Sequence, residues 1–373
     1  MKHAQTFEIF LIAPPGLEQS LWKEARAKGF PSARYTTGGV TLKGGWDDVW
    51  HANLVMRGAT RVLVRMGEFR AFHLAQLDKR CRKFDWAKYL RADVPVRVEA
   101  VTNKKSKIYH AGAAKERVER AIFETLGAEI SDEAEVTVKL RIDSNLCVFS
   151  LDTSGEALHK RGHKAAVGKA PMRETLATLF LGACGYDGQE PVLDPMCGSG
   201  TFVLEAAEIA AGMIPGRARS FAFEKLATFD ADAFALVRAT LPAPQAATLS
   251  FYGSDRNAGA IENASANAER AGLSANCHFR QAAISDLQRP EGDPGLVIIN
   301  PPYGARIGNK KQLFALYATM GAVLSERFSG WRVGIITTDG QLARATKLPF
   351  LPESAPIDHG GLRVKLFQTD PLP

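Results

Sequence analysis

The sequence predicts an α/β protein in which a doubly wound parallel sheet follows an α+β unit. Three observations support this prediction. The chain has 373 residues, 46% hydrophobic and 23% charged, which is enough apolar material for more than one hydrophobic core. Strands and helices are mixed up to about residue 155 but alternate from Met172 onward. Between the two patterns, residues 153–171 contain glycine, basic residues and few large apolar side chains, and so form the predicted linker.

The N-terminal pattern contains five predicted strands and three predicted helices. β-Branched residues and alternating polarity indicate the strands, and apolar residues at helical spacing indicate the helices. Gly127 is expected to end the third helix, because glycine adopts the left-handed conformation found at helix ends. The elements are strand 7–13, helix 17–28, helix 46–56, strand 62–69, strand 96–101, helix 111–126, strand 136–142 and strand 146–151.

The C-terminal pattern is typical of a parallel sheet, because parallel strands need crossover connections that helices usually supply. An insertion punctuated by proline and glycine, 212–244, interrupts it. The elements are helix 173–184, strand 191–194, helix 201–211, helix 229–240 inside the insertion, strand 248–254, helix 257–271, strands 276–281 and 295–300, helix 312–328, strand 332–337 and a terminal pair near 347–351 and 361–368.

Composition excludes several classes of protein. No apolar stretch approaches the roughly 18 residues that span a bilayer, and the opening apolar run 9–13 stops at Pro14 without a signal-peptide pattern. Five cysteines without a Cys-x-x-Cys pair argue against a disulfide framework, a zinc ribbon and an iron-sulfur cluster. His159 and His163 lack a nearby third ligand, so no metal is expected. We expect a cytoplasmic protein.

A carboxylate and a glycine turn follow one predicted buried strand. Ligands of open α/β sheets bind beyond the carboxyl ends of the strands, and Gly198 and Gly200 allow positive φ and close approach of the backbone. A pyrophosphate site would have a third glycine, and Asp194 would repel phosphate, so a ligand with an ammonium or amino-acid end fits better. The segment is Val192-Leu193-Asp194-Pro195-Met196-Cys197-Gly198-Ser199-Gly200-Thr201.

Two more motifs follow later strands. Asp255 is suited to accept hydrogen bonds from both hydroxyls of a ribose, although an acid there also suits a helix N-cap. In Asn300-Pro301-Pro302-Tyr303-Gly304, two prolines remove backbone donors, so the turn offers the Asn300 side-chain oxygen and the Pro301 carbonyl as acceptors. These acceptors suit an exocyclic amine of a base, and Tyr303 offers a stacking ring. The three motifs are expected to converge on one cleft.

These residues resemble motifs I, II and IV of class I S-adenosylmethionine-dependent methyltransferases. Residues 151–163, followed by Ala170-Pro171-Met172-Arg173-Glu174-Thr175-Leu176-Ala177, resemble the domain junction of the THUMP-domain rRNA guanine-N2 methyltransferases, the family of bacterial RlmL. The resemblance extends over nearly the whole chain. It implies a ferredoxin-like region at 1–60, a THUMP RNA-binding domain at 61–155, a linker at 156–171 and a Rossmann-like methyltransferase domain with a seven-stranded, mostly parallel sheet at 172–373. It also implies that this chain lacks the second methyltransferase fused in some bacterial members.

The resemblance further implies S-adenosyl-L-methionine as the cofactor. Family members usually carry an acid for the adenine amino group where this chain has Ala283, so either Asp286 or a backbone carbonyl is left for that role. Cys197 is expected to be a packing residue, because a 5-methylcytosine enzyme needs its cysteine beside the target base. The expected cofactor contacts are Asp194, Pro195, Met196, Cys197, Gly198, Gly200, Thr201, Asp255, Arg256, Asp286 and Asn300.

The expected reaction is an in-line methyl transfer to nitrogen, which needs alignment and exclusion of water rather than a metal. Asn300, Pro301, Pro302 and Tyr303 are the expected catalytic residues. The Asn300 side chain and the Pro301 carbonyl hold the two amine protons and direct the nitrogen lone pair to the methyl carbon. These acceptors also favour the positive charge that develops on nitrogen.

The charge distribution predicts an anionic partner. Up to residue 165 the chain has 28 basic and 20 acidic side chains, whereas the remainder has 19 and 20. Basic residues between 79 and 117 are interleaved with Phe84, Trp86, Tyr89 and Tyr109, and no acid occurs from Lys104 to Lys115. Such a surface suits the phosphates and unpaired bases of RNA, although a solvated surface over core aromatics would give the same pattern. The expected RNA contacts are Lys104, Lys105, Lys107, Tyr109, Lys115 and Arg161.

The favoured function is therefore an rRNA methyltransferase that acts on the exocyclic N2 amine of guanosine, with 23S rRNA as the expected substrate. An N6-adenine DNA methyltransferase is the main competing hypothesis, because the Asn-Pro-Pro-Tyr turn suits exocyclic amines in general. The sequence is also compatible with a protein-glutamine methyltransferase and with a non-catalytic RNA-binding or ribosome-assembly factor. It leaves the modified nucleotide and the oligomeric state open.

Overall fold

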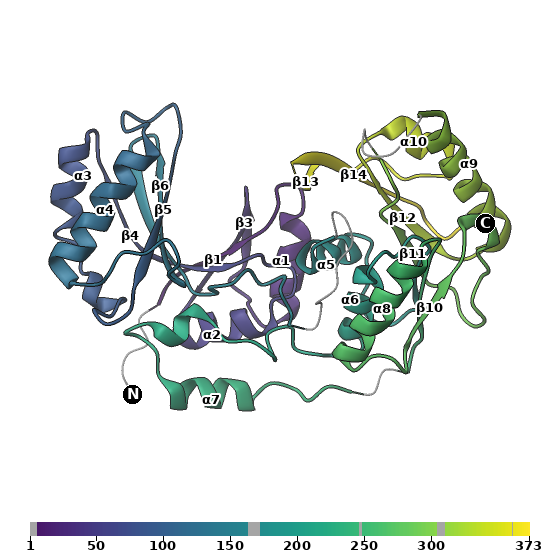
Figure 1. Cartoon of the computed structure of the whole chain (residues 1–373), viewed down its shortest axis with the longest axis horizontal. Helices are drawn as coiled ribbons and strands as arrows, with labels where there is room; N and C mark the ends of the chain where they lie inside the picture. Colours follow the sequence, from purple (N-terminus) through teal and green to yellow (C-terminus); the bar gives the residue numbers. More distant parts are fainter. Residues whose placement is uncertain (1–5, 163–171, 246–247, 304–309, 360) are drawn as a thin grey trace. The chain divides into compact units, whose positions relative to one another are not determined.

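The computed structural model describes residues 6–162, 172–245, 248–303, 310–359 and 361–373. The chain divides into two compact units, and the described residues form one seven-stranded sheet in each (Figure 1). The first unit falls within Met1–Ile12, Lys28–Leu158 and Ala218–Leu241, and the second within Ala13–Ala27, His159–Arg217 and Pro242–Pro373. Residues 13–27 and 218–241 thus each belong to a different unit from the one that a linear division near residue 172 assigns to them.

The sheet of the first unit has the strand order β2-β3-β1-β4-β7-β6-β5. Its neighbouring strands are antiparallel, except that β5 and β6 are parallel. The five strands expected in this unit form within one residue of their predicted bounds, whereas β2 and β3 were not predicted. All three residues of β2 are exposed, so β2 has no apolar alternation; Val40 and Leu42 of β3 do alternate with polar residues, but this run is short and lies between glycines. The strands are β1 (Phe7–Ile12), β2 (Arg34–Thr36), β3 (Gly39–Gly44), β4 (Val62–Arg70), β5 (Val96–Thr102), β6 (Val136–Asp143) and β7 (Leu146–Asp152).

The helices of the first unit include α2 (Trp46–Val55), α3 (Leu74–Cys81) and α4 (Ala111–Leu126). Gly127 ends α4 with a φ of 82°, and its N–H donates to the carbonyl of Phe123, as expected of a glycine cap. The sequence did not predict α3, because only Leu77 and Cys81 of its eight residues are buried. Helices α3 and α4 pack against each other on one side of strands β4 to β7 (Figure 1).

The insertion 218–241 packs on the first unit through aromatic side chains. It contains α7 (Ala231–Ala239), which contacts α2. Trp50 of α2 lies 6.1 to 6.3 Å, between ring centroids, from Phe223, Phe229 and Phe234 of the insertion. Tilted and edge-on rings at such separations attract one another beyond the area that they bury. The insertion is therefore a structural part of the first unit.

The sheet of the second unit has the order β10-β9-β8-β11-β12-β14-β13. The first five strands in this order, β10, β9, β8, β11 and β12, pair in parallel. Strand β14 is antiparallel to both β12 and β13. The order reverses between β8 and β11, which makes this the switch point of a doubly wound sheet. The strands are β8 (Val192–Asp194), β9 (Phe251–Asp255), β10 (Cys277–Gln281), β11 (Leu296–Ile299), β12 (Arg332–Thr337), β13 (Ile357–His359) and β14 (Leu362–Gln368).

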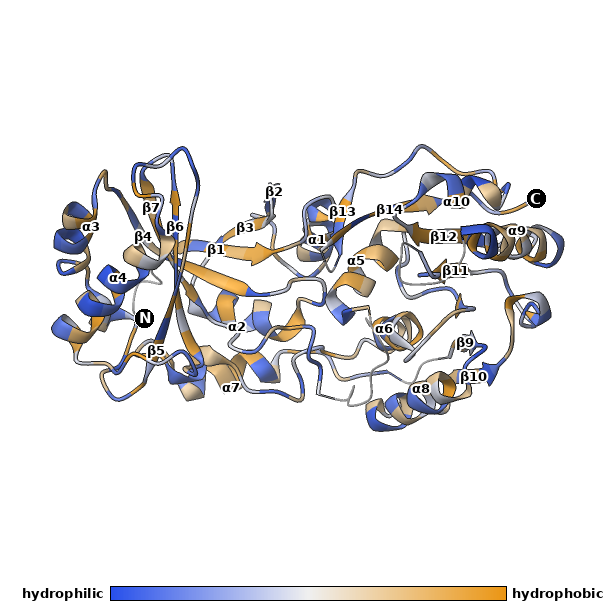
Figure 2. Cartoon of the chain, turned by 45° about the horizontal axis from the view of Figure 1, so that its top comes forward, coloured by the Kyte–Doolittle hydropathy of each residue, from blue (hydrophilic) through white to orange (hydrophobic). Residues whose placement is uncertain are grey.

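The helices of the second unit follow the predicted alternation of strand and helix. The predicted strand at 347–351 was wrong: only Phe350 forms an isolated bridge, to Thr369, and β13 pairs with β14 instead. Helix α1 packs against α5. The apolar strands and the polar outer sides of helices α3 and α4 are visible in Figure 2. The helices are α1 (Glu18–Ala27), α5 (Glu174–Ala183), α6 (Thr201–Ala210), α8 (Ala258–Ala271), α9 (Lys310–Arg327) and α10 (Gly340–Ala345), of which α10 was not predicted.

Candidate functional site

The three polar motifs follow three adjacent strands of the second sheet. Asp194 ends β8, Asp255 ends β9, and Asn300 comes directly after β11. These strands are neighbours in the order β9-β8-β11 and run parallel, so the motifs meet at one edge of the sheet. This is the edge, at the switch point, where ligands of doubly wound sheets bind.

Asp194 is a buried carboxyl whose side chain is 2% exposed. Its Oδ1 accepts a hydrogen bond of 3.0 Å from the N–H of Met196. Burial raises the pKa of Asp194 to about 8; the Met196 N–H opposes this shift and the charge of Asp255 adds to it. A cation placed beside Asp194 would restore its charge. The ammonium end of an amino-acid ligand is such a cation.

Asp255 joins the first two motifs. Its Oδ2 accepts from the N–H of Gly198 at 3.1 Å, and its Oδ1 accepts from the N–H of Asn257 at 2.9 Å. The N-cap of α8 is Asn257, whose side chain accepts from the N–H of Gly259. Asp255 is therefore not the helix cap, and its oxygens retain lone pairs for the hydroxyls of a ribose.

The two glycines of the first turn have different reasons to be glycine. Gly198 has a φ of +52°, and a Cβ there would meet nothing within 4 Å. Gly200 has a φ of +84°, and its Cβ would lie 3.1 to 3.2 Å from Phe279 and Ala264. The open side of Gly198 thus suits the approach of a ligand, whereas Gly200 lets the turn pack closely on β10 and α8.

The turn at Asn300 contains a hydrogen-bond acceptor to which no described residue donates. The Asn300 Oδ1 atom is buried and has no hydrogen-bond partner among the described residues. A buried polar atom without a partner costs free energy, so this oxygen is suited to accept a hydrogen bond from a ligand. Pro301 is buried, and the partly buried Tyr303 packs against the core cluster that includes Ile299. Gly304 lies outside the described residues.

Other expected cofactor residues occupy varied positions around the turn. Pro195 and Cys197 are buried, and burial raises the pKa of the Cys197 thiol, which agrees with a packing role rather than a nucleophile. Met196 packs partly on the core, and Thr201 begins α6. Arg256, Ala283 and Asp286 are exposed.

Sequence reasoning missed three residues that hold the motifs in place. The fully buried Asn267 on α8 donates to the carbonyl of Ser199 at 3.1 Å and so fixes the first turn. The ring of Phe279 lies where side chains at Gly200 and Gly253 would be. Tyr317 on α9 donates to the carbonyl of Pro302 at 3.3 Å. Apolar or amide residues on neighbouring helices and strands give no local signal of such contacts.

Four of the expected RNA contacts are exposed in one loop. Lys104, Lys105, Lys107 and Tyr109 lie between β5 and α4, and the Tyr109 side chain is 73% exposed. Lys115, on α4, forms ion pairs with Asp132 at 2.8 Å and Glu119 at 3.5 Å. Two of the aromatic residues interleaved with the basic ones, Trp86 and Tyr89, are buried and so belong to the core rather than to a surface that could contact RNA.

The expectation that Arg161 contacts RNA was wrong. Its side chain is 1% exposed, and its guanidinium pairs with the equally buried Glu205 of α6 at 3.3 Å. Glu205 also accepts from the hydroxyl of Thr178 at 2.7 Å. A buried charge needs a partner, and Arg161 and Glu205 supply it to each other within the segment His159–Arg217 of the second unit. His163, expected beside it, lies outside the described residues.

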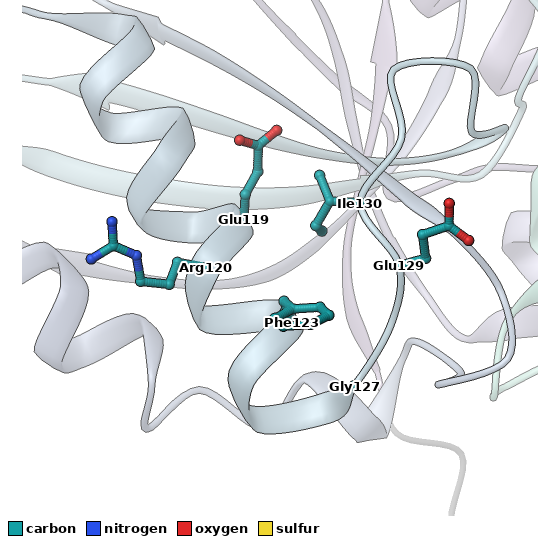
Figure 3. A pocket seen from close by; sticks show the side chains of 6 residues that line it. All are labelled: Glu119, Arg120, Phe123, Gly127, Glu129 and Ile130. Carbon is teal, nitrogen blue, oxygen red and sulfur yellow. The ribbon is translucent and has the colours of Figure 1, made fainter.

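A shallow cavity in the first unit is separate from these motifs. It has a volume of about 500 Å³ and lies at the end of α4, where Phe123 and Ile130 flank it (Figure 3). Glu119, Arg120 and Glu129 also line it, so its charges are mixed and it lacks the converging acceptors of the sheet edge. Among the described residues, no group of three or more His, Cys, Asp or Glu side chains has the geometry to hold a metal, and no helix is long and apolar enough to span a membrane.

Two segments match known families. Residues 161–351 match the RMKL-like methyltransferase domain, and residues 8–63 match the RlmL ferredoxin-like domain. The chain belongs to the RMKL-like methyltransferase family. The second match agrees with the order β1-α1-β2-β3-α2-β4 at the N-terminus, which is that of a ferredoxin-like domain.

Relatives with similar sequences are named as RNA methyltransferases. The chain is 31% identical over 377 residues to "Putative RNA methyltransferase slr0064" of Synechocystis sp., a match that covers 98% of this chain and 97% of that protein. It is 31% identical over 354 residues to the ribosomal RNA large subunit methyltransferase K/L of Methylococcus capsulatus, covering 91% of this chain and 48% of that protein. The chain thus spans about half the length of the K/L relative.

Solved structures agree with this family and its cofactor. The protein SMU.472, crystallised as a complex with SAH, is 27% identical, has a TM-score of 0.90 and is covered in full, as is this chain. A Listeria monocytogenes protein described as a predicted N6-adenine-specific DNA methylase is 29% identical with a TM-score of 0.87, and the match covers 98% of this chain and 96% of that one. The Rossmann-like methyltransferase fold and the dependence on S-adenosyl-L-methionine are confirmed.

Proposed function

We propose that this protein methylates the exocyclic N2 amine of a guanosine in 23S rRNA. The observation that carries the proposal is the buried Asn300 Oδ1 atom, which has no partner among the described residues although it lies at the ligand-binding edge of the sheet. An acceptor there suits an amine that enters the site only with the substrate. The names of the K/L relatives support an rRNA substrate.

The residues of the second unit suit the cofactor. Asp194 would hold its ammonium group, Asp255 its ribose hydroxyls, and the backbone beside Gly198 would lie against it. When bound, S-adenosyl-L-methionine supplies an electrophilic methyl group on a sulfonium. The chain itself orients the acceptor amine: Asn300 Oδ1 accepts a hydrogen bond from one amine N–H, the Pro301 carbonyl accepts one from the other, and Tyr303 stacks on the extruded base. As the nitrogen becomes positive, the two oxygens stabilise that charge more strongly.

We further propose that residues 61–155 form a THUMP RNA-binding domain and that three of its loops make a rigid platform for RNA. The Lys107 N–H donates to Asn145 Oδ1 at 2.8 Å, the Ala71 N–H donates to the Asn145 carbonyl at 3.0 Å, and the Asn103 side chain donates to Asp143. These bonds join the loops that follow β4, β5 and β6. Rigid loops lose little conformational entropy when they bind.

This loop platform presents aromatic rings beside cations. Phe72 is 44% and Tyr109 73% exposed, and the Lys107 ammonium lies 5.9 Å from the centre of the Phe72 ring. Exposed rings stack on unpaired bases and lysines attract phosphates, a combination that suits single-stranded RNA segments. Phe72 extends the residues expected from the sequence.

The test is methylation of rRNA from a strain that lacks this gene, followed by mass spectrometry of the nucleosides. We expect N2-methylguanosine to appear with wild-type protein. Asn300→Ala should slow single-turnover methyl transfer by about 100- to 1000-fold, because a positioned acceptor at a developing charge is lost, while its affinity for RNA changes little. Methylation of rRNA at another atom would overturn the guanine assignment.

The main competing function is that of an N6-adenine DNA methyltransferase, which the description of the Listeria monocytogenes protein favours. Both reactions use an exocyclic amine, so Asn300 serves either one. Duplex DNA assayed beside rRNA separates them. Formation of N6-methyladenine in DNA without methylation of rRNA would replace our proposal by this DNA methyltransferase.

A further inference from the structure

The turn after β11 is held from outside by a tyrosine. Pro301 and Pro302 have no N–H, so these positions cannot fix the turn with backbone donors of their own. Tyr317, on α9, donates its hydroxyl to the carbonyl of Pro302 at 3.3 Å. The Tyr317 side chain is fully buried, and it belongs to the core cluster against which Tyr303 packs.

The hydroxyl of Tyr317 is itself part of a chain of hydrogen bonds. The Asp339 N–H donates to Thr337 Oγ1 at 3.3 Å, and the Thr337 side chain forms a hydrogen bond with Tyr317. Burial raises the pKa of Tyr317 far above its usual value, so its hydroxyl keeps its proton and can donate at any physiological pH. Hydrogen bonds in such a chain polarise and strengthen one another.

We propose that Tyr317 is a positioning residue for methyl transfer: by holding the Pro302 carbonyl, it fixes the acceptors at Asn300 and Pro301 in the orientation that the amine requires. This inference rests on the proposed function of the same turn. A small misplacement of a reacting group costs much of the advantage of orientation. The unpartnered Asn300 Oδ1 makes the need for such support clear, because no described bond at that oxygen holds the Asn300 side chain.

The variant Tyr317→Phe tests this role, because it removes the hydroxyl and keeps the ring. Tyr186 offers a matched control: it is also buried in the second unit, and its hydroxyl donates to the carbonyl of Ala206 at 2.9 Å, away from the turn. We expect Tyr317→Phe to lower the single-turnover rate by about 10- to 100-fold. The dissociation constants of S-adenosylmethionine and RNA should stay unchanged. Tyr186→Phe should leave the rate unchanged even if it lowers the melting temperature.

A double-mutant cycle separates positioning from general stability. If the hydrogen-bonded chain acts as one unit, Thr337→Val should slow the wild-type enzyme but not slow Tyr317→Phe further. Full additivity of the two rate effects would show that the hydrogen bonds of Tyr317 and Thr337 do not act as one unit. A wild-type rate in Tyr317→Phe, or an equal loss of rate in Tyr186→Phe, would overturn the positioning role.

Failure of the proposed function is distinguishable from failure of this inference. If the wild type methylates DNA rather than rRNA, the function is wrong, and the same rate ratios are measured on DNA. Hydrogen exchange of the peptide 296–303, followed by mass spectrometry, needs no substrate. Exchange there should become faster in Tyr317→Phe than in both the wild type and Tyr186→Phe, and unchanged exchange would contradict the role of Tyr317.

Discussion

At the scale of single residues, two polar groups are buried at a free-energy cost that a bound ligand can offset. Asp194 is a buried carboxyl whose pKa is raised to about 8, and Asn300 Oδ1 lacks a described partner. Buried polar groups of this kind destabilise the free protein, and such groups cluster at functional sites. Both lie at the same sheet edge, where we propose that the cofactor and the substrate bind.

The raised pKa of Asp194 gives a pH dependence with a defined sign. Between its unfolded value near 4 and its folded value of about 8, the folded state binds the proton more tightly, so stability falls as pH rises through this window. Asp194→Asn should therefore raise the melting temperature at about pH 9 and change it little at about pH 5. Differential scanning fluorimetry at both pH values measures this. An equal shift at both would show that ionisation of Asp194 is not the cause.

The same substitution should weaken the binding of S-adenosylmethionine. An ionised Asp194 pairs with an ammonium, so wild-type affinity for S-adenosylmethionine should fall as pH drops below about 8, because the carboxyl must then lose a proton to bind. Asp194→Asn should bind more weakly and without this dependence. Calorimetric titration across the window measures both effects. Parallel pH profiles for the two proteins would remove Asp194 from the ammonium site.

At the scale of elements, the loop platform shows how strand ends build a surface. The exposed Phe72 and Tyr109 come from different loops, which Asn145 ties together by two hydrogen bonds. Local propensity says little about such loops, because their shape depends on partners far apart in sequence. The platform can therefore be tested one side chain at a time.

We expect Phe72→Ala and Tyr109→Ala each to weaken RNA binding by about 1 to 3 kcal/mol, the usual worth of a stacked base. Phe123→Ala is the matched control, because Phe123 is an exposed phenylalanine on α4, 59% exposed, that lines the cavity with Glu119 and Glu129. Fluorescence anisotropy with single-stranded rRNA fragments at fixed salt measures the affinities. Equal losses in all three variants would mean that the platform does not stack bases.

At the scale of the whole molecule, each unit contains a segment that a linear division of the chain would assign to the other unit. Residues 13–27 belong to the second unit, where α1 packs on α5, and residues 218–241 belong to the first, where three phenylalanines surround Trp50. The chain therefore passes between the units several times rather than once. Neither unit corresponds to one continuous stretch of sequence.

This exchange predicts the behaviour of a truncated protein. A fragment that begins at Met172 loses α1 and leaves Phe223, Phe229 and Phe234 without Trp50, so it should be less stable and should aggregate. A fragment that also has 218–241 replaced by a glycine-serine linker should stay soluble longer and bind S-adenosylmethionine, but not RNA. Size-exclusion chromatography and calorimetry compare the two. Identical solubility would contradict the structural role of the insertion.

The sequence by itself determined most of the regular elements and the three motifs. The bounds of α4 and the five strands of the first unit follow from local periodicity and glycine caps, and the motifs follow from residue types at strand ends. Tertiary structure alone decided the rest. Arg161 looks like a basic linker residue but is buried against Glu205, β2 is a strand with every residue exposed, and Tyr317 is an apolar-face residue of α9 that reaches the Pro302 carbonyl. Burial and pairing of this kind depend on which distant segments meet, and a local pattern contains no information about those partners.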